Sequence, residues 1–331
     1  MSAFLDSILA RAKADKQTIV LPEGDDERTL KAAESVLAQD IADLIILGDA
    51  AGIAASPYRL EGAQIIDPRT AENRKELAEA LYGLRKEKGL TQEEALALMD
   101  DVLHFGVMLV KAGKADGMVS GACHATSDVL RPCLQILKTA PGIKLVSAFF
   151  VMVVPECAYG EDGIFIFADS GLEVQPDAEQ LASIALSSAQ SWETLVQTEP
   201  VVAMLSHSTY GSAKNDDADK VIKATALAKE LAPGLALDGE LQLDAAIVPA
   251  VGASKAPGST VAGHANVLIF PDLDAGNIGY KLTQRLAKAE AYGPITQGIA
   301  APVNDLSRGC TAEDIVGVIG ITCVQAQARK A

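Results

Sequence analysis

The sequence lacks the cysteine pattern of a disulfide-rich or zinc-binding protein, and it has few aromatic residues. Its five cysteines include no Cys-x-x-Cys pair, and its four histidines show no His-x-x-x-His spacing. These patterns indicate neither a disulfide framework nor a structural zinc site, so no metal is expected. Aromatic residues make up 4% of the chain and hydrophobic residues 49%. The core must therefore be aliphatic, as in Val/Ile/Leu strands covered by helices.

Three motifs of common α/β enzymes are also missing. No Gly-x-Gly-x-x-Gly follows a predicted strand, no Gly-x-x-x-x-Gly-Lys-Ser/Thr occurs, and there is no Gly-x-Ser-x-Gly. These absences argue against a standard dinucleotide-binding enzyme, a P-loop nucleotidase and an α/β-hydrolase.

Positive charge is scarce. The chain has 28 Lys and Arg against 44 Asp and Glu, a formal charge of -16, which repels nucleic acid and anionic membranes. The N-terminal stretch lacks the apolar run of a signal peptide, and no apolar run is long enough to span a bilayer. We expect a cytoplasmic protein with no nucleic-acid and no membrane partner.

Short apolar runs alternate with amphipathic stretches along the 331 residues. This alternation predicts an α/β fold with mainly parallel sheets flanked by helices. The expected strands are 18–22, 43–48, 64–67, 117–121, 144–154, 163–168, 201–205 and 266–270. The expected helices are 4–15, 27–38, 71–112 with a restart at a Thr91-x-x-Glu94 capping box, 127–138, 178–194, 218–231, 277–291 and 311–327. Strands 144–154 and 163–168 could pair antiparallel, and the change of pattern near residue 145 predicts a second domain.

The segment from Ser120 to Pro132 runs from a strand end through small residues into a helix. Thr126 and Ser127 lie near the expected helix cap, and Arg131 follows about one turn later. Hydroxyls and free N–H groups at a helix start suit a phosphate. The alternative is an ordinary cap with a solvated arginine. We expect only loop or packing roles for Cys123, His124 and Cys133.

The segment from Asn304 to Cys310 places Ser307 and Arg308 just before a helix that carries Asp314 in its first turn. A guanidinium holds phosphate or carboxylate through paired hydrogen bonds. The alternative is that Thr311 and Asp314 form a capping box. Cys310 beside Arg308 is a candidate for a lowered pKa, but no histidine lies near it in the sequence to act as its base.

Two further segments are ambiguous. From Gly263 to Lys281, a strand and an Asp-rich turn lead into a helix in which Asn277 could be the cap. Gly276 and Gly279 would let a ligand approach the backbone, and Lys281 could meet an anion. By spacing alone, ordinary turn chemistry is the favoured explanation of this pattern. Arg85, at a basic helix end, by itself indicates only a solvated surface.

Taken together, these segments resemble the phosphate acetyltransferase (phosphotransacetylase) family in its short single-unit form. Any one match is weak, but their order and combination are specific. The matching segments are Leu21–Glu23, Gly121–Arg131, Phe167–Asp169, Asp238–Ala246, Phe270–Lys281, Gly293–Gly298 and Asp305–Gly309.

The resemblance implies reversible acetyl transfer between acetyl phosphate and coenzyme A, with direct attack of the thiol in a ternary complex. It implies two α/β domains, residues 1–145 with 300–331 and residues 146–299, an active-site cleft between them, and a homodimer formed by the second domain. No bound cofactor or metal is implied, since coenzyme A and acetyl phosphate are substrates. The implied roles cover eleven residues: catalysis by Ser307, Arg308 and Asp314, with Asp314 as base; phosphate or acetyl phosphate binding by Thr126, Ser127, Arg131, Tyr280 and Lys281; coenzyme A binding by Arg85, Asn277 and Gly279.

The phosphate loop departs from the family pattern. The family usually has Gly-Ala-Thr-His-Ser-Thr-Ala, whereas this chain has Cys123 and Ala125 at the third and fifth positions. Acyl preference is therefore open, and a phosphate butyryltransferase is the nearest alternative. A non-catalytic acyl-coenzyme A sensor is disfavoured because all three implied catalytic residues are present. A decarboxylating dehydrogenase would need a metal-binding carboxylate cluster, for which only Asp272 and Asp274 are candidates.

Overall fold

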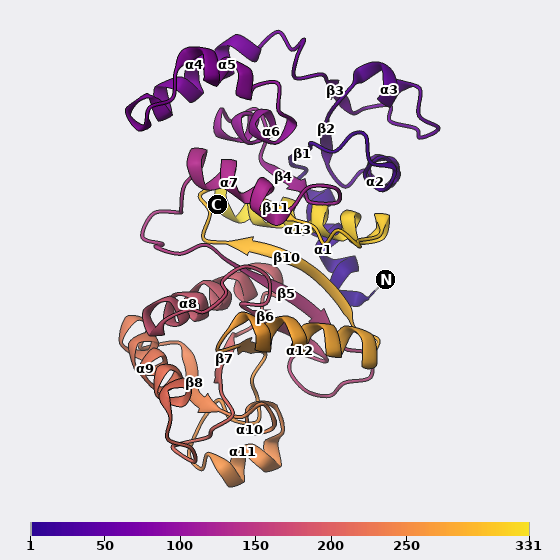
Figure 1. Cartoon of the computed structure of the whole chain (residues 1–331). Helices are drawn as coiled ribbons and strands as arrows, with labels where there is room; N and C mark the ends of the chain where they lie inside the picture. Colours follow the sequence, from indigo (N-terminus) through magenta and orange to yellow (C-terminus); the bar gives the residue numbers. More distant parts are fainter. Residues whose placement is uncertain (1, 331) are drawn as a thin grey trace. The chain divides into compact units, whose positions relative to one another are not determined.

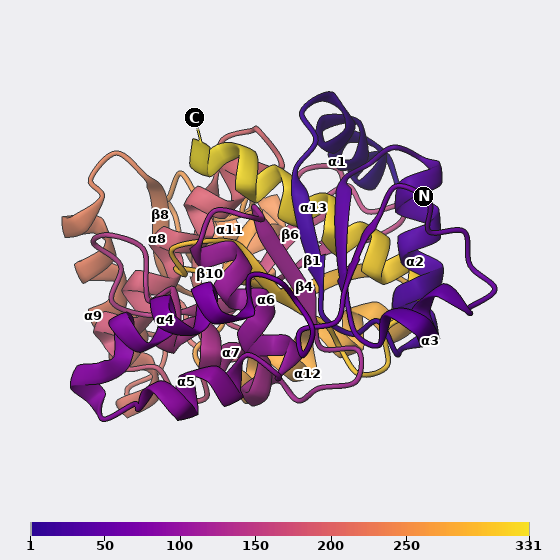
Figure 2. The same cartoon turned by 90° about the horizontal axis from the view of Figure 1, so that it is seen from above.

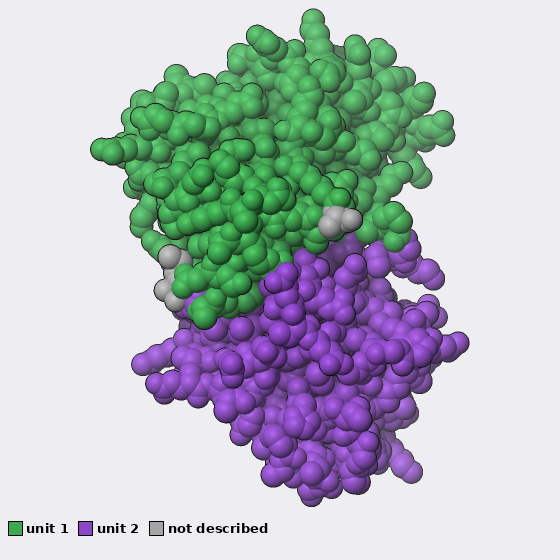
Figure 3. Space-filling view, turned by 180° about the vertical axis from the view of Figure 1, so that it is seen from behind, with its two compact units in different colours: residues 1, 3–141, 299–331 green, residues 2, 142–298 purple. Residues whose placement is uncertain are grey.

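The structure is a computed structural model that describes residues 2–330, and it divides into two compact units (Figure 3). Unit 1 comprises residues 3–141 and 299–331, and unit 2 comprises residues 142–298. The limits of the two predicted domains lie within a few residues of these. Each unit contains its own sheet covered by helices, which confirms the predicted fold class.

Unit 1 contains a five-stranded, fully parallel sheet in the order β11-β4-β1-β2-β3. The strands are β1 (Thr18–Leu21), β2 (Asp43–Leu47), β3 (Gln64–Ile66), β4 (Gly117–Ser120) and β11 (Val303–Asp305). The first four were predicted from their apolar runs. β11 was missed because Val303 is its only apolar residue, yet it places the segment before Ser307 directly beside β4.

Helices cover both faces of this sheet (Figures 1 and 2). On one face, α13 crosses β1 and β4 and packs on α1 and α2. On the other, α6 packs on β1 and β4, with α4 and α7 beside it. The helices of unit 1 are α1 (Ala3–Ala14), α2 (Glu27–Ala38), α3 (Ala50–Ala54), α4 (Arg74–Arg85), η1 (Lys86–Lys88), α5 (Gln92–Leu98), α6 (Val102–Lys111), α7 (Thr126–Ile136) and α13 (Ala312–Lys330).

The predicted helical region 71–112 is divided twice. The first break is the expected one: Thr91 and Glu94 form a capping box at the start of α5. The second was missed. Asp101 caps α6, and its carboxylate accepts a hydrogen bond from the His104 N–H at 2.9 Å. An aspartate at a helix start competes with continuation of the preceding helix.

Unit 2 contains a six-stranded mixed sheet in the order β10-β5-β6-β9-β7-β8. β6, β9, β7 and β8 are parallel, and β5 pairs antiparallel with both β6 and β10. The antiparallel pairing of β5 with β6 was predicted. The strands are β5 (Ser147–Val153), β6 (Ile164–Ala168), β7 (Val201–Leu205), β8 (Ala236–Leu241), β9 (Val267–Ile269) and β10 (Glu290–Gln297).

The longer helices of unit 2 pack on its sheet as two groups, α8 with α9 and α12 by itself. α8 and α9 pack together, α8 on β6, β9 and β7 and α9 on β7 and β8, while α12 packs on β5, β6 and β10. They are α8 (Ala178–Leu195), α9 (Asp216–Leu231), α10 (Leu243–Ile247), α11 (Pro249–Lys255) and α12 (Leu273–Leu286). Within residues 2–330, no helix combines the length and apolar character that crossing a membrane requires.

The prediction for α12 was wrong at both ends. Asp272, rather than Asn277, is the cap, and its side chain accepts the Ala275 N–H at 2.9 Å. The helix ends at Leu286, and the last residues of the predicted helix belong to β10. Asp272 is the better cap because it has extended backbone and a carboxylate acceptor.

Candidate active site

Three loops of unit 1 meet at the carboxyl edge of its sheet. They follow β1, β4 and β11, which are neighbours in the order β11-β4-β1. The chain order reverses beside β1, because β2 lies on one side of it and β4 on the other. Such a switch point leaves a crevice beyond the strand ends where α/β proteins bind ligands. The loops are residues 22–26, 121–125 and 306–311.

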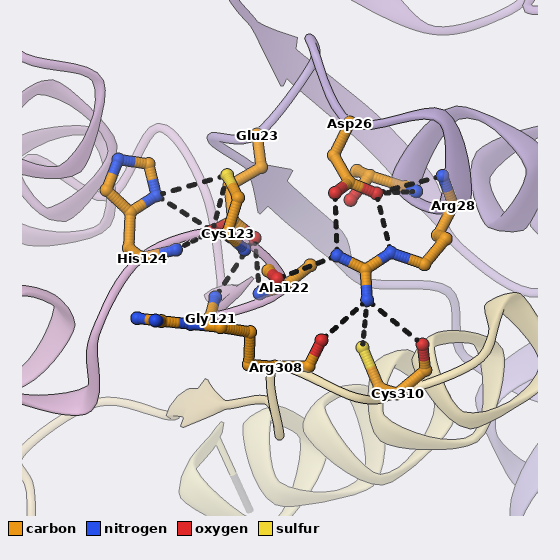
Figure 4. A network of polar contacts seen from close by, with 10 residues as sticks. Glu23, Asp26, Arg28, Gly121, Ala122, Cys123, His124, Arg308 and Cys310 are labelled. Atoms are coloured by element: carbon orange, nitrogen blue, oxygen red, sulfur yellow. Dashed lines mark hydrogen bonds and ion pairs between the residues drawn. The ribbon is translucent and has the colours of Figure 1, made fainter.

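Glu23, in the first loop, organises the second (Figure 4). One carboxylate oxygen accepts the backbone N–H groups of Gly121 and Ala122 at 3.0 and 2.9 Å. The other accepts those of Cys123 and His124 at 3.0 and 3.1 Å, and lies 2.8 Å from the His124 ring nitrogen Nδ1. The side chain is 1% exposed, so a buried anion holds four consecutive residues of the loop.

These contacts change the electrostatics of the loop. Burial opposes the charge of Glu23, but the hydrogen bonds from Cys123, His124 and Ala122 outweigh it and hold the pKa below its usual value. The N–H groups of residues 121–124 are not available to a phosphate, because Glu23 occupies them. Leu21–Glu23 was noted only as a matching segment, and its proline–glutamate pair gave no indication of a partner 100 residues away.

Arg28 connects all three loops (Figure 4). Its guanidinium, on the first turn of α2, pairs with Asp26 at the end of the first loop, at 2.7 Å. It also donates to the carbonyl oxygens of Ala122 at 2.7 Å, Arg308 at 2.8 Å and Cys310 at 3.2 Å. A planar guanidinium with five N–H donors suits such divergent acceptors. Sequence reasoning missed this residue, because an arginine in the first turn of a helix resembles any solvated surface charge.

Asp305, the last residue of β11, is 1% exposed and carries a buried carboxylate at the same edge. One oxygen accepts the Thr126 hydroxyl at 2.5 Å, and the other has no hydrogen-bond partner in the described structure. Burial raises the pKa of Asp305 to about 6, against the opposing effect of the Thr126 hydrogen bond. Asp305 was noted only as part of a matching segment and was given no role.

The Asp305 contact defines what Thr126 can offer a ligand. While Asp305 is ionised, the Thr126 hydroxyl donates its proton to the carboxylate and can only accept a further hydrogen bond. When Asp305 is protonated, the carboxylic acid can donate instead and the Thr126 proton becomes available to an anion. Thr126 is also the first residue of α7, and Ala125 occupies the cap position without a side-chain hydrogen bond. The expected hydroxyl cap is therefore absent.

Ser307 and Arg308 are both exposed on the third loop. The Cys310 N–H donates to the Ser307 carbonyl at 2.9 Å, which closes a turn. The Arg308 carbonyl faces Arg28, and the Arg308 side chain extends away from that contact (Figure 4). The structure therefore places two of the predicted catalytic residues at the crevice with their side chains accessible.

Asp314 and Cys310 are held more tightly. Asp314 accepts the Thr311 N–H at 2.9 Å, while the Thr311 hydroxyl accepts the Asp314 N–H at 3.1 Å. This reciprocal pair is the capping box given as the alternative to catalysis. Burial raises the pKa of Cys310 to about 11 despite the nearby Arg28. The expected lowering was wrong, because desolvation of the thiolate outweighs the arginine.

The remaining predicted residues of unit 1 lie on helices. Ser127 and Arg131 are exposed on α7, in and just beyond its first turn. Arg85 is the half-buried last residue of α4, and it lines a 250 Å³ pocket together with Lys88 and His104. These positions leave the side chains of Ser127 and Arg131 accessible.

The four predicted residues of unit 2 share helix α12. Tyr280 is buried and stacks on Phe150, with ring centroids 3.9 Å apart. The exposed Lys281 amine lies 5.7 Å from the Tyr280 ring centre. Asn277 donates to the Ser170 carbonyl at 3.3 Å.

The glycines of α12 are explained by packing. A Cβ atom on Gly276 would lie 2.2 Å from the Asp169 carbonyl oxygen. One on Gly279 would lie 3.1 Å from the Phe270 ring. Gly276 therefore requires a small residue whether or not a ligand approaches it, and a side chain at Gly279 would press on the Phe270 ring.

Comparison with known proteins agrees with this architecture. The sequence profile described as "Phosphate acetyl/butaryl transferase" matches residues 3–323. A phosphate acetyltransferase of Acetivibrio thermocellus is 62% identical over 331 residues, covering 99% of this chain and all of the relative. One of Thermoanaerobacterium thermosaccharolyticum is 59% identical over 98% of this chain and all of the relative. A phosphotransacetylase structure from Streptococcus pyogenes is 44% identical, with a TM-score of 0.92 over 99% of this chain and all of that one.

The parallel sheet, with its switch point at β1, defines the class of α/β proteins that bind ligands beyond their strand ends. Within this class, the sequence profile that matches residues 3–323 identifies one family. The chain belongs to the phosphate acetyl/butaryl transferase family.

Proposed function

We propose that this protein is a phosphate acetyltransferase, which transfers an acetyl group reversibly between acetyl phosphate and coenzyme A. The observation that carries this proposal is the 62% identity to a phosphate acetyltransferase along its full length. The accessible Ser307 and Arg308 at the switch-point crevice support it. Coenzyme A, acetyl phosphate and phosphate are the proposed small-molecule partners.

In the proposed reaction the coenzyme A thiol attacks the acetyl carbonyl directly, within a ternary complex. Asp314 accepts the thiol proton, the C–S bond forms, and the C–O bond to phosphate breaks. The carbonyl oxygen becomes an oxyanion that needs fixed donors, which Ser307 and Arg308 supply. Phosphate leaves already charged, so this step requires no metal ion.

The proposed phosphate contacts are Ser127 and Arg131, with Thr126 as a third partner. Arg131 supplies the positive charge. Thr126 donates to phosphate only when Asp305 is protonated, because otherwise its proton is held by the carboxylate. Tyr280 and Lys281 are proposed to complete the acetyl phosphate site; Arg85, Asn277 and Gly279 are proposed to contact coenzyme A.

The test is thioester formation from acetyl phosphate and coenzyme A, followed by ultraviolet absorbance. Ser307→Ala and Arg308→Ala should each lower kcat by a hundredfold to a thousandfold, the order expected when an oxyanion donor is lost. Arg329→Ala, an exposed arginine near the end of α13, is the matched control and should retain activity. Wild-type turnover in Arg308→Ala would remove that residue from the mechanism.

Asp314 needs its own test because it also caps α13. Asp314→Asn should lower kcat while coenzyme A binding persists, since an amide can still accept the Thr311 N–H but cannot take a proton. An unchanged kcat would leave Asp314 with capping alone.

Two alternatives are separated in the same assay. Faster turnover with butyryl phosphate than with acetyl phosphate would indicate a butyryltransferase. Binding of acetyl-coenzyme A without turnover of either acyl phosphate would indicate a sensor. We further propose a cytoplasmic homodimer formed through unit 2, which light scattering of the full chain tests directly.

A further inference from the structure

Beyond the proposed reaction, the loop held by Glu23 gathers three different metal-ligating atoms. The Cys123 thiol lies 3.3 Å from a Glu23 carboxylate oxygen and 3.6 Å from Nδ1 of His124. That nitrogen lies 2.8 Å from the same oxygen. In Figure 4 the thiol and the imidazole lie side by side against the carboxylate. None of these contacts has a role in the acyl transfer described above.

We propose that Glu23, Cys123 and His124 form a binding site for Zn²⁺ or a similar thiolate-preferring divalent ion. One sulfur, one imidazole nitrogen and one carboxylate oxygen are the three ligand types that zinc binds in proteins. Three protein ligands leave the fourth position of a tetrahedral ion open. Solvent can reach that position because Cys123 is exposed.

The spacing supports this assignment. Tetrahedral zinc with its usual bond lengths separates these ligand atoms by about 3.4–3.6 Å. The sulfur–nitrogen and sulfur–oxygen distances, 3.6 and 3.3 Å, are already close to that range. Only the 2.8 Å nitrogen–oxygen contact must widen. The His124 side chain, 30% exposed, has room to move.

The surroundings also favour a cation. Four backbone N–H groups fix the Glu23 carboxylate in the loop, and outer hydrogen bonds of this kind orient metal ligands. Asp25 and Asp26 add negative charge near the thiol, and Arg28 adds a positive one.

Binding requires two proton movements. The Cys123 thiol releases its proton to solvent as the metal–sulfur bond forms. The imidazole must present a lone pair at Nδ1, so its remaining proton resides on Nε2. Glu23 loses the hydrogen bonds from the thiol and the ring but keeps those from the backbone.

The test uses the full chain freed of metal by a chelator and titrated with Zn²⁺ in a calorimeter without substrates. One ion per chain should bind, and Cys123→Ser should weaken binding by about a hundredfold or more, since loss of an outer partner alone costs 10–100-fold. Cys157→Ser is the matched control, because Cys157 is a partly exposed cysteine of unit 2 outside the cluster. It should leave binding unchanged.

A second measurement guards against indirect effects of the substitutions. Co²⁺ bound to the wild type should show thiolate-to-cobalt charge-transfer absorption and the intense visible bands of a tetrahedral site. Both should be lost in Cys123→Ser, and His124→Gln should alter the visible bands. Absence of Zn²⁺ binding to the wild type, or equal binding to Cys123→Ser, would overturn the proposal. Either result leaves the acyltransferase assay unaffected.

Discussion

Asp305 is a carboxylate in an environment that disfavours its charge. It lies at the carboxyl end of β11, 1% exposed, with one oxygen lacking a hydrogen-bond partner in the described structure. Its pKa rises from 3.8 to about 6 because burial penalises the ionised form, and the charge of Glu23 adds to this. An unsatisfied buried carboxylate lowers the free energy of unfolding. The ionised Asp305 side chain therefore destabilises the folded protein.

The first prediction concerns Asp305→Asn. The native chain binds the Asp305 proton more tightly than the unfolded chain, so the contribution of Asp305 to stability falls as pH rises from 3.8 to about 6. Above that range the ionised group destabilises the fold by about 3 kcal/mol. The amide variant lacks this penalty and should be more stable than wild type at pH 8, with a difference that disappears below pH 3.8.

Urea unfolding at several pH values measures this difference. The control is Asp162→Asn, an exposed aspartate, whose stability should follow that of the wild type. A variant less stable than wild type at pH 8 would show that the Asp305 charge has a favourable partner in solution.

The second prediction concerns Glu23. Glu23→Ala removes the acceptor of four backbone N–H groups, and should lower the free energy of unfolding by about 2–4 kcal/mol. Its lowered pKa means that the wild-type carboxylate stabilises the fold above its ordinary value of 4.5, and that this contribution is lost as pH falls through the folded pKa.

The Glu23 measurement is urea unfolding of Glu23→Ala and Glu23→Gln at neutral pH. Glutamine retains one oxygen, so its loss of stability should be intermediate. Equal stability of Glu23→Ala and wild type would mean that solvent replaces the carboxylate.

At the scale of elements, Arg28 ties helix α2 to the loops that follow β4 and β11. Among the side chains labelled in Figure 4, it alone donates hydrogen bonds to both loops. Together with the pairing of β11 and β4, this guanidinium holds the loop of Ser307 and Arg308 against residues 121–124. The exposed pair of Lys31 with Glu313 also links α2 to α13, one turn further on, but exposed pairs contribute little.

The third prediction follows from the difference between the Arg28 contacts and the exposed Lys31–Glu313 pair. Arg28→Lys keeps the charge but cannot hold carboxylate and three carbonyls in a fixed plane, so kcat should fall tenfold or more. Lys31→Ala is the matched control on the same helix and should retain kcat. Steady-state kinetics of both variants and the wild type measure this effect. A kcat of Arg28→Lys equal to that of the wild type would show that Arg28 does not position the loops.

The limits of elements could be predicted where signals are local. Asp26 caps α2, and the helix was predicted with its observed limits, Glu27–Ala38. The limits of α12 were wrong because three candidate caps, Asp272, Asp274 and Asn277, lie within six residues. Choosing among them depends on packing against Asp169 and Phe270, which no local pattern contains.

At the scale of the whole molecule, the two units differ in how the chain builds them. Unit 2 is one continuous segment with its own six-stranded sheet and core. Unit 1 needs residues 299–331 to supply its edge strand β11 and the buried helix α13.

The fourth prediction is that residues 142–298 fold when expressed alone, because every strand pairing of their sheet is internal. Residues 1–141 alone should not, because α13 covers one face of their sheet. Circular dichroism and cooperative urea unfolding of the two fragments measure this. A non-cooperative 142–298 fragment would show that unit 2 depends on the rest of the chain.

Local sequence patterns sufficed for the alternating α/β architecture, the approximate limits of several helices and the Ser307–Arg308 pair, since periodicity and caps act over a few residues. The partners that shape the site depend on strand order. Glu23 reaches residues 121–124, and Thr126 reaches Asp305 across 179 positions. These pairs form because β1, β4 and β11 become neighbours only when the sheet assembles, and their energies depend on burial that the sheet and its helices create.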